Sequence, residues 1–200
     1  MTTAGTSTRS RILEAAWALV RDRGTNDVTL AEIAGAAGVS RQLVYFHFEN
    51  RAGLLVAMAR HHDVRSGFRE RVAATRLLPP EEGIEALLRA WCEYIPEILP
   101  VARALEAAVM TSDESGDAWQ DRMDDLWQAF RMAVERVEIE GRLAEGWTVE
   151  TATDWMWARA HLTTWRHLVG ERGWSPEDYE ERSVRSILNE ILILPPRQQV

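Results

Sequence analysis

The feature that most constrains the fold is the stretch from Thr29 to Arg51, TLAEIAGAAGVSRQLVYFHFENR. Thr29 stands three residues before Glu32, which is the spacing of a capping box at the start of a helix. Gly38 follows a run of small residues and suits a left-handed helix end. Ser40 is a favourable cap for the start of a second helix. The pattern therefore predicts two short helices joined by a tight turn, a helix-turn-helix.

The second of these helices carries different residues on its two sides. Val44 and Phe48 are four residues apart, so both are expected to face the core. Tyr45 is expected on the opposite side, with His47 near the edge of that side. Because a helix-turn-helix reads duplex DNA with its second helix, the pattern indicates a DNA partner. The alternative is a helical hairpin without a DNA role, in which Tyr45 and Phe46 belong to the core.

The same stretch resembles the DNA-binding domain of TetR-family transcriptional repressors. The family pattern is T-x-x-x-I-A-x-x-A-G-V-S, then Tyr-x-(His or Tyr)-Phe, then a Lys or Arg three residues later. The residues that match it are Thr29, Ile33, Ala34, Ala37, Gly38, Val39, Ser40, Tyr45, His47, Phe48 and Arg51. Residues 11–23 with Gly24 resemble the family's first helix, and Leu54 and Leu55 resemble the start of its fourth. The resemblance covers about the first quarter of the chain.

The resemblance implies two kinds of DNA contact. Phosphates would be contacted by Thr29, Ser40, Tyr45, His47 and Arg51, and base edges by Arg41, Gln42 and Leu43. Leu43 stands where the family commonly has a small or hydroxylated residue, so it either reads a thymine methyl group or packs. Gly53 stands where the family usually has a helix-favouring residue, and this exchange costs up to about 1 kcal/mol of helix stability.

Charge is distributed unevenly along the chain, whose formal net charge is −8. The first sixty residues contain seven arginines and five acidic residues, whereas the remainder carries a net charge of −10. We therefore expect the N-terminal part to face DNA and the acidic remainder to point away from it. Every basic residue is Arg, which binds phosphate and guanine in a bidentate manner.

The remaining composition favours a soluble, cytoplasmic protein without membrane contact. The first ten residues are polar and lack the apolar segment of a signal peptide. No apolar run has the length needed to span a bilayer. Cys92 is the single cysteine, so a disulfide framework is excluded and a buried, unreactive thiol is expected.

Beyond Arg51 the apolar residues recur at helical spacing, without the alternation of strands. We expect an all-α fold with a flexible arm over about residues 1–8, a helix-turn-helix domain over 1–51 and a helical bundle over 52–200. The resemblance assigns ligand binding and dimerisation to the bundle. Pro96 and Pro100 are expected to interrupt it. Its expected helices, with a polar loop over 111–117, are 52–76, 81–94, 101–110, 118–140, 148–169 and one that opens at Ser175-Pro176.

Tryptophan is unusually frequent, with nine in the chain and eight of them from Trp91 onward. Indole rings line hydrophobic cavities well, and the resemblance implies a small effector, so we expect an aromatic-walled pocket in the bundle. The candidate residues are Trp91, Tyr94, Met110, Met123, Trp127, Phe130, Trp155 and His161. The alternative for each is plain packing in the core or a dimer interface. Indoles near carboxylates would also suit a lipophilic cation.

The resemblance further implies a homodimer, held by the last two helices of each chain as a four-helix bundle, on a near-palindromic operator. The segment 148–169 carries apolar residues on more than one face, so it needs two packing partners. The candidates for the dimer interface are Trp157, Leu168, Val184, Ile187, Leu188 and Ile191.

No pattern indicates enzymatic chemistry, a metal or a cofactor. His61, His62 and Asp63 are adjacent in a helix, where neighbouring side chains diverge by about 100° and share one ion poorly. The favoured hypothesis is a one-component repressor that leaves its palindromic operator when a small hydrophobic or aromatic effector binds. Two rivals remain, an all-α enzyme and a binding or scaffolding protein that does not use DNA.

Overall fold

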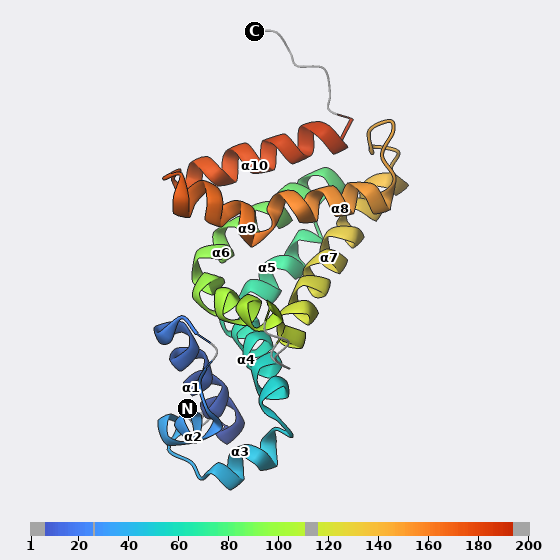
Figure 1. The fold of residues 1–200 in the computed structure, drawn as a ribbon. Coiled ribbons are helices and arrows are strands. Elements are labelled where there is room, and N and C mark those ends of the chain that lie inside the picture. Colours follow the sequence, from blue (N-terminus) through green and yellow to red (C-terminus); the bar gives the residue numbers. More distant parts are fainter. Residues whose placement is uncertain (1–6, 26, 111–115, 194–200) are drawn as a thin grey trace, which may run out of the picture. The chain divides into compact units, whose positions relative to one another are not determined.

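The computed structural model describes residues 7–25, 27–110 and 116–193, which are mostly helical (Figure 1). The all-α class is confirmed. The helices in chain order are α1 (Thr8–Arg23), α2 (Leu30–Ala37), α3 (Arg41–His47), α4 (Arg51–Arg65), α5 (Phe68–Thr75), α6 (Pro80–Met110), α7 (Gly116–Ile139), α8 (Val149–Ala160), α9 (Leu162–Trp165), the π-helix η1 (Arg166–Glu171) and α10 (Pro176–Ile191). Among the helices of the described residues, none combines the length and the apolar character that crossing a bilayer requires.

The chain divides into two compact units. Unit 1 consists of Met1–Gly67 and Glu97–Asp124, so it contains α1 to α4, the end of α6 and the start of α7. Unit 2 consists of Phe68–Pro96 and Asp125–Val200, and contains α5, the remaining parts of α6 and α7, and the helices from α8 to α10. The division of function predicted between residues 51 and 52 stays a prediction.

The predicted turn signals are present as local hydrogen bonds. Glu32 N donates to Thr29 Oγ1 over 3.2 Å, and Thr29 N donates to Glu32 Oε2 over 2.8 Å, which completes the capping box of α2. Gly38 ends α2 in the left-handed conformation, with φ 65°. Ser40 Oγ then accepts a hydrogen bond from Leu43 N over 3.2 Å and caps α3. These three local devices fix the turn between α2 and α3.

The core of unit 1 is built from the inward faces of α1 to α4. Apolar side chains at helical spacing are buried on each of these helices, and their burial stabilises the arrangement by about 25 cal/mol per Å² of apolar surface. The largest of them are Ile12, Leu13, Trp17, Val20, Ile33, Val44, Phe48, Leu54, Leu55 and Met58. The predicted inward direction of Val44 and Phe48 is confirmed.

Several helix boundaries differ from the prediction. The helix predicted over 52–76 is two helices, α4 and α5, because Gly67 takes a left-handed φ of 73° after α4 ends. The helix predicted over 148–169 stops at Ala160, because His161 adopts extended backbone and its ring Nδ1 accepts a hydrogen bond from Thr163 N. The first helix begins at Thr8, three residues earlier than predicted and inside the expected arm.

The interruption predicted at Pro96 and Pro100 is also wrong, because α6 continues through both residues. A proline inside a helix removes one backbone hydrogen bond and strains the preceding turn. Buried apolar side chains on both sides of the prolines oppose this cost, because the amphipathic stripe of α6 does not end at them. The buried stripe includes Ile84, Leu87, Leu88, Trp91, Ile95, Val101 and Leu105.

In unit 2, α8 packs against α10, and polar contacts join both helices to α6. Trp91 Nε1 on α6 donates to the Ala160 carbonyl at the end of α8 over 2.7 Å. Arg89 on α6 donates to Glu180 on α10 over 2.8 Å. Cys92 lies buried in this region, and its burial raises the pKa of the thiol to about 12, so an unreactive thiol is the expected chemistry.

Candidate nucleic-acid interface

Helix α3 presents a well-defined exposed face. Arg41 and Gln42 are exposed in its first turn, and Tyr45 follows with half of its surface (51%) in solvent. Val44 is buried on the opposite side of the helix, so the core fixes which way the exposed face points. Two long polar side chains and a phenol that project from a rigidly packed helix can reach base edges and phosphates together.

The other α3 residues divide differently from the prediction. Leu43 and His47 are only half exposed and lie on the flank of the helix. The sequence predicts Phe46 either in the core or without a role. In the structure 82% of its surface is in solvent, so it is more exposed than Tyr45. The alternative that puts Tyr45 and Phe46 in the core is therefore wrong. Phe46 stands four residues after Gln42, and this helical spacing is the sequence signal that places both side chains on the same exposed face.

Two residues predicted to contact phosphate also cap the starts of helices. Thr29 and Ser40 are exposed N-caps, and their hydroxyls accept backbone hydrogen bonds inside the chain. Hydrogen bonds from Arg23 and then from Thr29 lower the pKa of the Glu32 carboxyl to about 2. The Arg23 guanidinium lies 2.8 Å from Glu32. The start of α2 is thus held by a network that stays ionised at neutral pH.

Arg51, predicted to contact phosphate, is half-buried at the start of α4. Its Nε donates to the Val28 carbonyl over 3.2 Å, which ties α4 to the segment before α2. Asn50 caps the same helix, because its Oδ1 accepts a hydrogen bond from Gly53 N over 2.8 Å. This hydrogen bond connects the start of α4 with the segment that leads into the helix-turn-helix.

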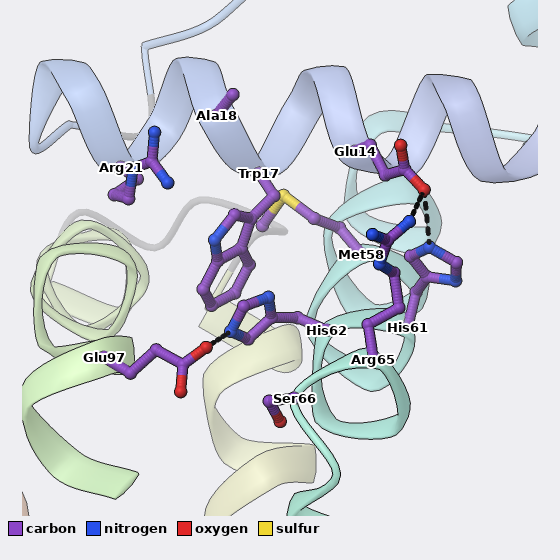
Figure 2. Close-up of a pocket in the computed structure, with 10 residues that line it drawn as sticks. All are labelled: Glu14, Trp17, Ala18, Arg21, Met58, His61, His62, Arg65, Ser66 and Glu97. Atoms are coloured by element: carbon purple, nitrogen blue, oxygen red, sulfur yellow. Dashed lines mark hydrogen bonds and ion pairs between the residues drawn. The ribbon is translucent and has the colours of Figure 1, made fainter.

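One turn of α4 is connected to three other helical segments of unit 1. Figure 2 shows Glu14 of α1 beside Arg65 and His61, with His61 Nε2 3.7 Å from the Glu14 carboxylate. His62 lies on the other side of the same turn, where its ring stacks on Trp17 with centroids 3.5 Å apart and planes 9° from parallel. His62 Nε2 is 2.9 Å from Glu97 Oε1 on α6 (Figure 2).

Asp63 completes this junction on the side of α7. It is 5% exposed and forms an ion pair with Arg122, while its neighbour Arg60 pairs with Asp121 over 2.8 Å. His61, His62 and Asp63 therefore point to three different partners, as the predicted divergence of adjacent helical residues requires. Within the described part of the chain, no group of three or more His, Cys, Asp or Glu side chains could hold a metal ion.

A cavity of about 390 Å³ opens at this junction, and Figure 2 shows the side chains that line it. Its lining combines indole, imidazole and thioether groups with two carboxylates and two guanidiniums. Burial lowers the pKa of His62, and this effect outweighs the Glu97 carboxylate, which raises it. The lining residues are Glu14, Trp17, Ala18, Arg21, Met58, His61, His62, Arg65, Ser66 and Glu97.

The predicted effector residues do not form one group. Met123 belongs to unit 1, and the side chain of Met110 lies outside the described residues. In unit 2, Trp91 and Tyr94 are buried in a packed aromatic cluster with Phe68, whose ring stacks on Tyr94 at 4.2 Å.

The remaining effector candidates have varied surroundings. Phe130 is fully buried, and His161 serves as the cap between α8 and α9. Trp127 Nε1 donates to Asp154 over 2.8 Å, and Trp155 lies 6.1 Å from the ring of Trp147. The Trp127 indole on α7 beside the Asp154 carboxylate on α8 is the pair in this set that best suits a cationic ligand.

The predicted dimer residues also separate by burial. Val184, Ile187 and Ile191 on α10 are almost completely buried within the single chain, because they pack into the core of unit 2. Leu188, Trp157 and Leu168 are half exposed and keep surface that a second chain could cover. The dimer interface stays a prediction, and these three are the predicted residues with surface left in the single chain.

The chain is similar to known bacterial regulators. Residues 12–58 match the family of bacterial regulatory proteins called the tetR family. The HTH-type transcriptional repressor BepR of Brucella suis is 28% identical over 92% of this chain and 91% of its own length. TtgW of Pseudomonas putida, an uncharacterized HTH-type transcriptional regulator, is 36% identical over 54% of this chain and 78% of its own length.

Among solved structures, a candidate transcriptional regulator of Saccharomonospora viridis in complex with choline has the same fold. It superimposes with a TM-score of 0.72 at 21% identity, over 92% of this chain and 97% of its own. At this identity the likeness extends to the architecture, in which a helix-turn-helix precedes a helical body.

Proposed function

Because this chain belongs to the TetR family of transcriptional regulators, which bind DNA and are not enzymes, we propose that it is a repressor released from a palindromic operator by a small effector. The observation that supports this most is the exposed face of α3, where Arg41, Gln42 and Tyr45 project from a helix whose other side is buried. The predicted DNA-binding set is retained. The protein is proposed to act in the cytoplasm, where bacterial DNA lies.

A homodimer would place two copies of α3 on one face of the duplex. Two half-sites one helical turn apart, about 34–36 Å, then give the operator its palindromic form. The half-exposed residues Trp157, Leu168 and Leu188 support a contact between copies through α8, η1 and α10. In this proposal residues 1–51 contact DNA, while residues 52–200 bind the effector and the second chain.

The effector is proposed to be hydrophobic or aromatic and positively charged. Trp127 donates to the Asp154 carboxylate on α8, so indole and carboxylate groups already lie together. A cation is attracted both by an indole face and by a carboxylate. The Saccharomonospora viridis structure, solved with choline, provides a precedent for a small cation in a protein of this fold.

Helix α4 is the proposed element of coupling. Its start is tied to the Val28 carbonyl through Arg51, and its last turns are tied to α6 and α7 through His62, Asp63 and Arg60. An effector that binds better when α6 and α7 shift would move α4, and with it the spacing of the two recognition helices. The coupling equals the difference in effector affinity between the DNA-competent and DNA-incompetent states.

The first test is selection of genomic DNA fragments by the purified protein at near-physiological salt. The proposal predicts enrichment of a palindromic site, and choline or the larger aromatic cation tetraphenylphosphonium then serves as a release probe. If a folded dimer enriches no fragment, the repressor function is refuted and a DNA-free ligand binder is favoured. If every ligand that quenches tryptophan fluorescence leaves operator affinity unchanged, the allosteric part of the proposal fails.

A further inference from the structure

Phe46 is an exposed aromatic side chain on the helix that the proposed function assigns to DNA. With 82% of its surface in solvent, it contributes little to the core, and its ring has an edge contact with His47 at 5.4 Å between centroids. An exposed phenylalanine gains nothing from water, whereas it gains free energy when an apolar surface covers it. The position of Phe46 on α3 indicates which surface that is.

The four exposed residues of α3 lie on one side of the helix. At 100° per residue, Tyr45 lies about 40° from Arg41, and Phe46 lies about 40° from Gln42. Leu43 is turned away from this side and is half-buried. The exposed face therefore consists of two polar residues in the first turn and two aromatic residues in the second. Phe46 lies one turn after Gln42 on this face.

The chemistry of Phe46 limits what it can contact on DNA. Its ring has no hydrogen-bond donor, so it cannot bond a phosphate or a base acceptor as a tyrosine could. The apolar group that the major groove presents is the C5-methyl group of thymine. Leu43, for which the sequence leaves either this contact or packing open, is half-buried in the structure.

We propose that Phe46 is a specificity residue that reads a thymine methyl group in each operator half-site, an inference that rests on the proposed DNA-binding function. Four residues of helix rise by about 6 Å, which corresponds to roughly two base-pair steps of 3.4 Å. The thymine lies within about two base pairs of the base pair read by Gln42. Phe46 thereby favours A·T over G·C at a position where Arg41 and Gln42 do not reach.

Replacing thymine by uracil in a synthetic operator tests this directly, because the exchange removes only the methyl group. Each thymine of the selected site is exchanged in turn, symmetrically in both half-sites, and affinity is measured by fluorescence anisotropy. One buried methyl group corresponds to a loss of about fourfold per half-site, or about fifteenfold for the symmetric pair. The wild type is expected to show this loss at one symmetric pair of thymines.

The variants Phe46→Ser and Phe46→Leu separate the role of the ring from other effects, and Leu43→Ala is the matched control. Phe46→Ser should bind the thymine and uracil operators equally, Phe46→Leu should keep part of the discrimination, and Leu43→Ala should keep all of it. Because Phe46 is exposed, the circular dichroism melting curves of both its variants should match that of the wild type.

Each other outcome overturns the inference. If Phe46→Ser weakens binding to both operators by the same factor, the ring contacts the sugar-phosphate backbone instead. If discrimination is lost in Leu43→Ala, Leu43 is the reader. If no thymine is sensitive in the wild type although a palindromic site is bound, Phe46 reads no methyl group while the repressor function stands. A protein that selects no site refutes the repressor function itself.

Discussion

Replacing Arg122 by Ala is expected to destabilise unit 1 by about 3 kcal/mol. The substitution removes the guanidinium that faces Asp63, whose side chain is 7% exposed, while the side chain of Arg122 is 18% exposed. Removing one partner of a buried ion pair costs about 3–5 kcal/mol, because the remaining charge stays in a poorly solvated place. The partial exposure of Arg122 places the cost at the lower end of this range.

The matched control is Arg60→Ala, at a residue of α4 that lies one turn before Asp63. Arg60 and Asp121 form a direct ion pair of 2.8 Å, but their side chains are 52% and 33% exposed, so water screens the charges. Its loss should cost at most about 1 kcal/mol. The double variant Asp63→Leu with Arg122→Met replaces both buried charges by apolar groups, and its stability should return to within about 1 kcal/mol of the wild type.

The assay is urea denaturation followed by circular dichroism, with hydrogen exchange of α4 peptides to locate the loss in unit 1. If Arg122→Ala costs no more than Arg60→Ala, burial does not determine the strength of the pair and the reasoning is refuted. If the double variant is as unstable as Arg122→Ala, the cost arises from lost packing rather than from the loss of the ion pair at the buried Asp63 carboxylate.

Arg51→Ala should weaken binding to all DNA sequences and reduce the slope of log affinity against log salt by about one unit. Gln42→Ala should instead relax the preference at one base pair. Identical effects of both variants in an anisotropy series would contradict the division into a phosphate contact and a base contact. Burial lowers the pKa of His62 below its ordinary value of 6.5, so between these two pKa values the unfolded chain binds more protons than the folded one. Stability should therefore fall as pH drops from 6.5 toward the folded pKa, and less so in His62→Phe. Gly83→Ala should destabilise, since its Cβ would lie 2.7 Å from the last carbonyl of α5. Gly35→Ala, which meets open space in α2, should instead raise the melting temperature through a gain of up to about 1 kcal/mol.

The helix-turn-helix could be predicted from the sequence because its signals are local. Thr29 and Glu32 satisfy each other's backbone groups within one turn, Gly38 needs only its own φ of 65°, and Ser40 caps the residues that follow it. Such contacts depend on a few neighbouring residues, so the rest of the chain has little influence on them. The inward direction of Val44 followed equally from helical spacing.

The helices of the second part could be predicted less well, because their ends depend on packing. Pro96 and Pro100 carry a strong local signal for a break, yet buried side chains along α6 carry the helix through both. His161 carries no such signal, and it ends α8 only because its ring can cap the next turn. Residue type predicts the effector candidates, but it does not reveal that Trp91 is buried in packing.

Sequence alone predicted the helix-turn-helix and the residues, Ser40 and Arg41, at which its second helix begins. Tertiary structure decided which side chains remain available, since exposure depends on residues distant in the chain. Phe46 is exposed and Leu43 is half-buried, although both are apolar members of the same helix. Asp63 is buried beside Arg122, 59 residues away, and no local pattern records that pairing, because only the packed fold brings α4 and α7 together.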